Sequence, residues 1–287
     1  TAEVPWDVYT DEVKDSVAQY GDAAIVTLSR VGGEGADLSY GEVNYLALDE
    51  NEKAMLQNVA EMKKNGTVKK TILLINSANA LQVDFLKNNE YDIDAALWIG
   101  DVGISGINAV AEILTGKVNP SGSLVDTYCY DNFSAPAMWN FTPTTYEGYV
   151  EGGDVSAKAK SYMIYQEGIY VGYKYYETRY EDTILGQGNA DSTVGTKAST
   201  DGWNYAEEVC FPFGYGLSYT NYEYSLDKLD YNSDTDTFTA TVTVSNTGDR
   251  DGKATVELYA QTPYTDYDKQ NNVEKSSIQL LGYDKID

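Results

Sequence analysis

The chain has 287 residues, 42% of them hydrophobic, and a formal net charge of −25 at pH 7. This length suits one large or two small domains with a real core. Such an acidic surface repels phosphates, and we therefore expect no nucleic-acid partner and no membrane partner. Binding of a neutral ligand carries no such electrostatic cost. No apolar run is long enough to cross a bilayer, and no signal peptide is recognisable.

The chain contains no histidine and only two cysteines, Cys129 and Cys210. The lack of histidine excludes Ser-His and Cys-His catalysis and His-based metal sites within this chain. The two cysteines have neither metal-site spacing nor the number for a disulfide scaffold, so we expect two buried free thiols. We expect no cofactor and no metal ion. Acid–base chemistry must come from carboxylates, Tyr or Lys.

The first half of the sequence alternates strand and helix patterns. A continuous apolar run at 23–29 predicts a strand buried on both faces, and 71–77 predicts a second buried strand. Further strands are predicted at 95–100, where Trp98 is expected in the core, and at 123–127. Strands that alternate with helices predict a parallel sheet covered on both faces.

Helix signals lie between these strands. Asp11 is expected to cap the first helix, and Asp49 with Glu52 has the spacing of a capping box for the next one. Apolar spacing predicts two more helices around 81–86 and 107–114. Short connections between such elements agree with a compact α/β domain.

The second half has a different character. Residues 131–205 are rich in Gly, Tyr, Asp, Ser and Thr and are interpreted as surface loops with one or two late strands. The stretches 237–246 and 254–261 alternate like half-buried strands and predict the start of a β-sandwich. Because the chain opens with Thr1 and stops at Asp287, we expect a fragment whose half sandwich has open edges that something else shields.

Three loops follow the ends of the predicted parallel strands, at 30–37, 76–79 and 100–103. In open α/β sheets, ligands bind outside the carboxyl ends of the strands. The first loop is the most informative, because it places Glu34 between two glycines, where the backbone adopts unusual angles and lets another surface approach.

The glycines of this loop do not make a dinucleotide fingerprint. Gly33 and Gly35 fit the spacing, but Leu38 stands where the third glycine belongs. The carboxylate of Glu34 would also repel a pyrophosphate. A plain tight turn that tolerates Glu34 stays open as an alternative at this point.

The segment SRVGGEGADLS at 29–39 resembles the Gly-Glu-Gly loop of family 3 glycoside hydrolases, the β-glucosidase-like enzymes. Further segments resemble the same family in the same order, and together they cover nearly the whole chain. These segments are 76–81, 96–124, 167–178, 211–225 and the stretch from about 239 onward.

The resemblance implies an α/β fold. Residues 1–220 would form a three-layer α/β/α sandwich with a mainly parallel sheet of about six strands. Residues 221–287 would form a partial fibronectin type III-like β-sandwich. The family pairs this sandwich with a (β/α)8 barrel, which this chain lacks and which we expect in the same parent protein.

The resemblance also implies a division of chemical labour. Glu34 would be the general acid/base of a retaining β-glycosidase, and the nucleophilic Asp would lie on the absent barrel. The substrate would be a β-glucoside or oligosaccharide with a terminal non-reducing β-D-glucosyl residue. We expect the chain alone to be inactive, because one carboxylate cannot carry out a double displacement.

Two neighbours of Glu34 are candidate substrate-binding residues. Asp37 has three open interpretations: it fixes the loop, it bonds a sugar hydroxyl, or it is a solvated loop residue. Arg30 either orients Glu34 through a charged hydrogen bond or makes an ordinary surface ion pair. The loop tryptophans Trp139 and Trp203 are weaker candidates for a sugar subsite.

Two alternatives to the β-glucosidase interpretation stay open. The first is a non-catalytic module that binds carbohydrate or mediates assembly. The second keeps the chemistry but changes the substrate class to β-xylosides. The tyrosines clustered at 170–180 could stack on sugars, but we interpret them as packing the sandwich against the last domain.

Overall fold

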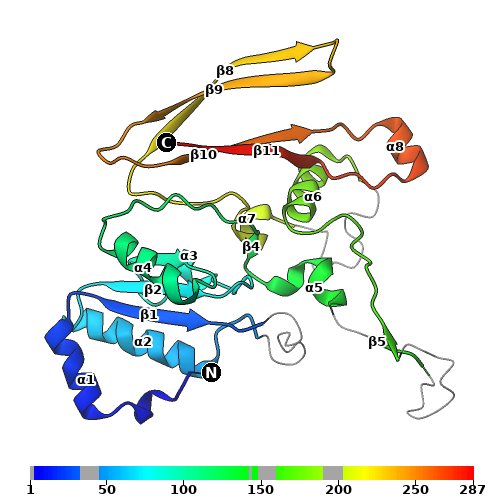
Figure 1. Ribbon diagram of the computed structural model, residues 1–287. Helices are drawn as coiled ribbons and strands as arrows, with labels where there is room; N and C mark the ends of the chain where they lie inside the picture. The colour runs from blue at the N-terminus through cyan, green and yellow to red at the C-terminus, as the bar shows by residue number, and fades with distance from the viewer. Residues whose placement is uncertain (1–2, 33–44, 142–143, 148–159, 190–202) are drawn as a thin grey trace.

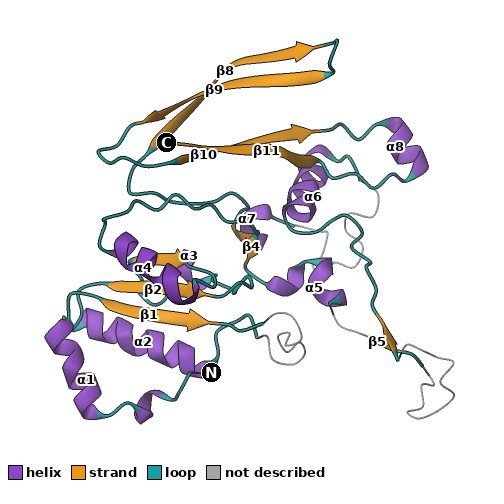
Figure 2. Cartoon of the chain, in the orientation of Figure 1, coloured by secondary structure: helices purple, strands orange, loops and turns teal. Residues whose placement is uncertain are grey.

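The structure is a computed structural model that describes residues 3–32, 45–141, 144–147, 160–189 and 203–287. Its α/β part contains a parallel sheet, and its C-terminal part consists of antiparallel strands (Figures 1 and 2). Within these ranges, no helix has both the length and the apolar character that crossing a membrane requires.

The central sheet has three parallel strands in the order β1–β2–β3. They are β1 (Ala24–Ser29), β2 (Thr71–Asn76) and β3 (Ala95–Trp98). The α/β class and the first three predicted strands are therefore confirmed. In the described part of the chain this sheet has three strands, whereas the resemblance implied about six.

Helix α2 (Glu50–Lys64) covers one face of this sheet (Figure 1). Its side chains Leu56 and Val59 join Val26 and Leu28 of β1 in one buried cluster. Burying such side chains contributes about 1.5–3 kcal/mol each, so this layer holds the strand ends in place.

The outer strands are more open than predicted. β2 is buried along most of its length, as expected, but β1 alternates between buried and exposed positions, and Ile25 is 54% exposed. Trp98 on β3 is 37% exposed. The predictions of a first strand buried on both faces and of a core Trp98 are therefore wrong. Among the described residues, both strands lie at the edges of the sheet, where each has one neighbouring strand instead of two.

The helix caps agree closely with the sequence. The capping box of Asp49 and Glu52 is present at α2, as predicted. Helix α1 (Asp11–Val17) is capped by Thr10, not by Asp11. The predicted cap is wrong by one residue, and Asp11 instead places its negative charge in the first helical turn, where the helix dipole favours it.

Short elements connect the sheet to the rest of the chain. Helix α4 (Gly103–Leu114) confirms the helix predicted around 107–114. Helix α3 (Phe85–Asn88) overlaps the helix predicted around 81–86 only at its end, and Leu81 precedes it. The elements are η1 (Trp6–Val8), η2 (Ala18–Tyr20), α3 (Phe85–Asn88), α4 (Gly103–Leu114), β4 (Tyr128–Cys129), η3 (Asn132–Ser134), α5 (Pro136–Asn140), β5 (Thr144–Thr145), β6 (Ser161–Tyr162), α7 (Tyr205–Glu208) and β7 (Val209–Phe211).

Residues 123–127 do not form the predicted fourth strand. Leu124 instead exchanges two hydrogen bonds with a distant segment: its amide donates to the carbonyl of Tyr215, and its carbonyl accepts from the amide of Gly214, both at 2.8 Å. Two hydrogen bonds are too few for a strand pair, and the apolar side chain of Leu124 packs against the buried cluster of the sheet.

The tyrosine-rich stretch contains helix α6 (Tyr173–Leu185), which the sequence did not predict. The Tyr173 hydroxyl accepts a 3.1 Å hydrogen bond from the amide of Leu280, and the Tyr170 hydroxyl accepts one of 3.1 Å from the amide of Lys275. These contacts confirm that the tyrosines pack the α/β part against the C-terminal strands.

The C-terminal part consists of two antiparallel pairs, β8–β9 and β10–β11 (Figure 2). The strands predicted at 237–246 and 254–261 are confirmed. The elements are β8 (Tyr222–Asn232), β9 (Thr237–Asn246), β10 (Ala254–Gln261), α8 (Asp266–Asn271) and β11 (Ile278–Ile286). Short antiparallel pairs also occur before residue 220, between β4 and β7 and between β5 and β6. The domain boundary predicted at residue 220 stays a prediction.

Candidate functional site

The carboxyl ends of β1, β2 and β3 meet at one edge of the sheet, because all three strands are parallel. Arg30 follows β1, residues 77–79 follow β2, and residues 100–103 come after β3. Glu34 and Asp37, the predicted acid/base and its neighbour, lie outside the described residues. The structure therefore describes the ends of the strands but not the loop of Glu34 itself.

Hydrogen bonds join the three strand ends. The Arg30 amide donates to the carbonyl of Asn76 at 3.3 Å, and the Asn76 side chain donates to the hydroxyl of Ser29 at 3.3 Å. The indole Nε1 of Trp98 donates to the carbonyl of Ser77 at 2.8 Å. The edge is thus a connected surface, as a site supported by rigid elements requires.

Arg30 is buried and makes an ion pair with Glu52. Its guanidinium donates to both carboxylate oxygens of Glu52, at 2.6 and 2.8 Å. It also donates to the carbonyls of Ser29, Tyr45 and Ala47. An arginine side chain has five N–H donors, and these five bonds employ all of them.

The ion pair expected of Arg30 is therefore present, but it is buried instead of lying at the surface. No described contact tests whether Arg30 touches Glu34 or a sugar, and both stay predictions. What the structure adds is the partner, Glu52, which the sequence singled out only as part of a helix cap.

Two further polar or aromatic groups lie at this edge. Trp98 is partly exposed beside Gly100, whose positive φ of 55° turns the chain after β3. The side-chain oxygen of Asn79 is buried and has no hydrogen-bond partner within the described part of the chain. The sequence singled out Trp98 but assigned it to the core, whereas it is the last residue of β3 and is partly exposed.

Trp203 was a candidate for a sugar subsite, but it is only 9% exposed. Its ring lies 4.8 Å from the guanidinium carbon of Arg179, a cation–π contact. Trp203 therefore packs inside the fold. The side chain of Trp139, the other candidate, lies outside the described residues.

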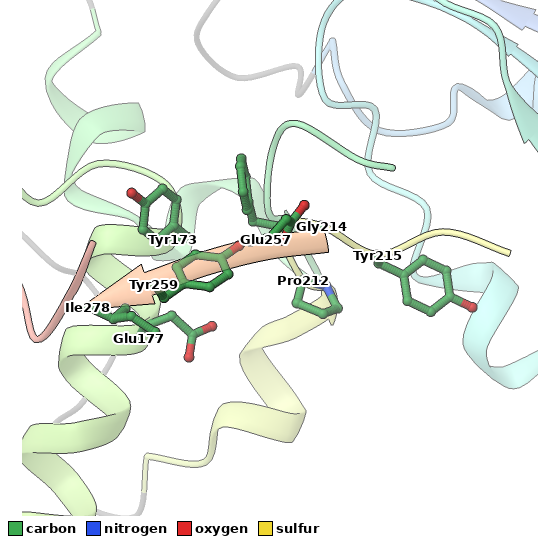
Figure 3. A pocket seen from close by; sticks show the side chains of 9 residues that line it. Tyr173, Glu177, Pro212, Gly214, Tyr215, Glu257, Tyr259 and Ile278 are labelled. Carbon is green, nitrogen blue, oxygen red and sulfur yellow. Dashed lines mark hydrogen bonds between the residues drawn. The ribbon is translucent and has the colours of Figure 1, made fainter. Parts of the chain in front are cut away.

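A cavity of about 350 Å³ lies between α6, residues 212–215, β10 and β11, away from the strand ends (Figure 3). Aromatic rings and two carboxylates line it. Burial raises the pKa of Glu177, although a hydrogen bond from the Tyr205 hydroxyl opposes this shift. Glu257 accepts a 2.6 Å hydrogen bond from the Tyr259 hydroxyl. The lining residues are Tyr173, Glu177, Pro212, Phe213, Gly214, Tyr215, Glu257, Tyr259 and Ile278.

Comparison with known proteins finds β-glucosidases. The chain is 30% identical to a β-glucosidase of Ruminococcus albus and 32% identical to β-glucosidase A of Butyrivibrio fibrisolvens, over 99% and 96% of its own length. It is also 28% identical to an exo-α-(1→6)-L-arabinopyranosidase of Bifidobacterium longum over 81% of its length. The chain spans only 23%, 31% and 23% of these three relatives.

A solved structure shares the fold. The β-glucosidase of Paenibacillus barengoltzii superposes with a TM-score of 0.72 and 26% identity, over 100% of this chain and 26% of that one. Residues 8–173 match the glycosyl hydrolase family 3 C-terminal domain, which is more than half of the chain. The protein therefore belongs to glycosyl hydrolase family 3, through the C-terminal domain of that family.

Proposed function

We propose that this chain is part of a retaining β-glucosidase-like glycoside hydrolase and that it supplies Glu34 as the general acid/base. The nucleophilic Asp would lie on a (β/α)8 barrel of the same parent protein. The observation that carries the proposal is the family match over residues 8–173, together with relatives named β-glucosidases. In the sequence, Glu34 comes after β1, and in such folds ligands bind outside the carboxyl ends of the strands.

The proposal extends to the architecture. Residues 1–220 would belong to a three-layer α/β/α sandwich with about six strands in its sheet. Residues 221–287 would belong to a fibronectin type III-like sandwich. The parallel order of β1, β2 and β3 and the antiparallel pairs after residue 220 support this division.

The chemistry is a double displacement. The barrel Asp attacks the anomeric carbon, the bond to the leaving oxygen breaks with its electron pair, and Glu34 gives that oxygen a proton. Water then attacks the anomeric carbon and gives its proton to the Glu34 carboxylate, and the bond to Asp breaks. The products are the free sugar and the alcohol, and the proton that Glu34 gave to the leaving oxygen has been replaced by one from water.

Glu34 must hold its proton near neutral pH to act as the acid. An apolar wall or a nearby anion raises the pKa of a carboxyl group. In this proposal the barrel supplies that environment when it closes over the loop. Asp37 then bonds a sugar hydroxyl or fixes the loop.

The substrate is a β-glucoside or oligosaccharide with a terminal β-D-glucosyl residue. One relative is an arabinopyranosidase, which acts on a pentoside. Pentosides, including β-xylosides, are therefore the next substrate class to test. A panel of aryl glycosides measured with the parent protein decides between them by kcat/KM. A preference for the xyloside or the arabinopyranoside over the glucoside would overturn the glucosidase assignment.

One experiment distinguishes the proposed catalytic role of the chain from that of a non-catalytic module. The chain is assayed alone and again after addition of a separately produced barrel. We expect no hydrolysis of an aryl β-glucoside by the chain alone and recovered hydrolysis with the barrel. Turnover by the purified chain alone would overturn the two-part mechanism.

A second candidate function is carbohydrate binding without catalysis, and the cavity in Figure 3 favours it. Its volume of about 350 Å³ accommodates a sugar ring, and tyrosine faces with carboxylate acceptors are groups that bind sugars. Glucan binding that is lost in Glu257→Gln, without hydrolysis on addition of the barrel, would support this function.

A further inference from the structure

The cavity in Figure 3 brings together aromatic rings and carboxylates from separate parts of the chain. Tyr173 and Glu177 lie one turn apart on α6, so their side chains share one face of the helix. Glu257 and Tyr259 both belong to β10, and Phe213 lies between β7 and β8. The cavity therefore forms only where α6 packs against the C-terminal strands.

Three of the rings are in contact with one another. The ring centroid of Tyr173 lies 4.8 Å from that of Phe213 and 6.3 Å from that of Tyr259. The hydrogen bond from the Leu280 amide holds the Tyr173 hydroxyl in place. The face of an aromatic ring is its negative part, so such a surface attracts a cation as well as apolar C–H groups.

Neutral groups hold the two carboxylates in position. Glu257 accepts its 2.6 Å hydrogen bond from the Tyr259 hydroxyl, and Glu177 accepts one from the Tyr205 hydroxyl. Gly214 leaves room for Glu257, because a Cβ at position 214 would lie 2.5 Å from a carboxylate oxygen. The φ of 79° at Gly214 also favours glycine there.

The carboxylates lack a counter-charge in the described part of the chain. The lining residues include neither lysine nor arginine, and no described ion pair involves Glu177 or Glu257. Burial raises the pKa of Glu177, as expected for an acid whose negative charge is not compensated. The net charge of −25 adds to this negative field. A cationic ligand would supply the counter-charge.

We propose that this cavity binds a protonated amino sugar, with its ring on the aromatic surface and its ammonium group in the negative field of Glu177 and Glu257. The volume of about 350 Å³ suits one sugar ring. The inference rests on the second candidate function, carbohydrate binding in this cavity, and names the class of sugar. The ammonium group adds charge-assisted hydrogen bonds and a cation–π contact, which a neutral sugar does not provide.

The test is calorimetric titration of the chain with glucosamine, glucose and N-acetylglucosamine. The titrations are made at about pH 6, where an amine is protonated and an ordinary carboxyl group is ionised. We expect glucosamine to bind at least about tenfold more tightly than either neutral sugar, because one charge-assisted hydrogen bond accounts for that ratio. Added salt should reduce the ratio.

Two variants and a matched control locate the binding site. Glu177→Gln and Glu257→Gln keep the shape of each side chain and a hydrogen-bond acceptor, and each should reduce the preference for glucosamine. Glu223→Gln removes the same charge from an exposed position on β8 that does not line the cavity. This control should leave the preference unchanged. An equal loss of preference in the control would overturn the assignment to the cavity.

The results with the wild-type chain decide between the two levels of the proposal, even where a variant does not fold. Equal affinity for glucosamine and glucose would overturn the amino-sugar class and leave carbohydrate binding in place. Binding of none of the three sugars would overturn both. The proposed β-glucosidase role is tested separately, by hydrolysis after addition of the barrel.

Discussion

Lys63 and Asp94 form an ion pair of 2.8 Å at the amino edge of the sheet, opposite the candidate site. Asp94 also accepts hydrogen bonds of 2.8 Å from Lys70 and from the amide of Thr71. Partial burial opposes ionisation of Asp94, but these hydrogen bonds outweigh it and hold its pKa well below the ordinary value. The cluster therefore supports the fold at a distance from the proposed chemistry.

This depressed pKa predicts a pH dependence of stability. A carboxylate with a lowered folded pKa stabilises the fold above its ordinary pKa of about 4, and the contribution is lost as pH falls toward the folded pKa. Asp94→Asn should lower the free energy of unfolding by about 1 kcal/mol at pH 7. Urea denaturation should show the gap to wild type narrowing from pH 5 to pH 3. A gap that does not change with pH would contradict this account.

The Arg30–Glu52 pair makes a separate prediction for stability. Glu52→Gln leaves the buried guanidinium of Arg30 without its counter-charge, and it should lower the free energy of unfolding by about 3 kcal/mol. The double variant Arg30→Met with Glu52→Leu should lose less than that. Chemical denaturation of both variants checks this, and a double variant less stable than Glu52→Gln would speak against it.

The two cysteines should be unreactive in the folded chain. Both thiols are free and buried, as the sequence predicted. Burial raises the pKa of Cys129 to about 11 and that of Cys210 to about 12, so the reactive thiolate is scarce at neutral pH. A thiol reagent should label neither residue in native buffer and both in denaturant. Rapid labelling of the native chain would contradict the described burial.

Trp98 should contribute to substrate binding in the parent protein. Its indole is partly exposed at the end of β3 and is oriented by its hydrogen bond to Ser77. Aromatic faces stack on sugar rings, so Trp98→Ala should raise KM about tenfold with little change in kcat. Trp6, outside this edge, supplies the control Trp6→Ala. Equal kinetics of the wild type and Trp98→Ala would exclude a contact with the substrate.

The local sequence signals predicted the α/β part well. Continuous apolar runs identified β1, β2 and β3, and the Asp49–Glu52 spacing identified the start of α2. Such signals are local, since a strand or a cap depends on neighbours within a few residues. The parallel order then follows from the alternation of strands with helices.

The sequence did not predict features that depend on distant partners. α6 was missed because its buried side chains are Tyr175, Tyr176, Thr178 and Arg179, which do not form an apolar stripe. Gly172 before α6 and Gly186 after it were available as boundary signals. Hydrophobic periodicity does not predict the burial of polar or aromatic side chains whose partners lie far away in the sequence.

In the candidate site, too, the sequence predicts what depends on a local motif but not what depends on distant partners. A motif is enough to single out Glu34, because glycines flank it on both sides. The pairing of Arg30 with Glu52 spans 22 positions and appears only when β1 and α2 pack together. Sequence reasoning therefore found the proposed donor but not the Arg30–Glu52 ion pair.

Chemical rescue of Glu34→Ala in the parent protein tests the central claim most directly. With a dinitrophenyl β-glucoside, the first displacement needs no acid, but the second has lost the base that activates water. Azide attacks the glycosyl-enzyme without a base, so added azide should restore turnover and yield the β-glycosyl azide. Turnover that stays low in azide, with no glycosyl azide formed, would contradict the assignment of Glu34 as the acid/base.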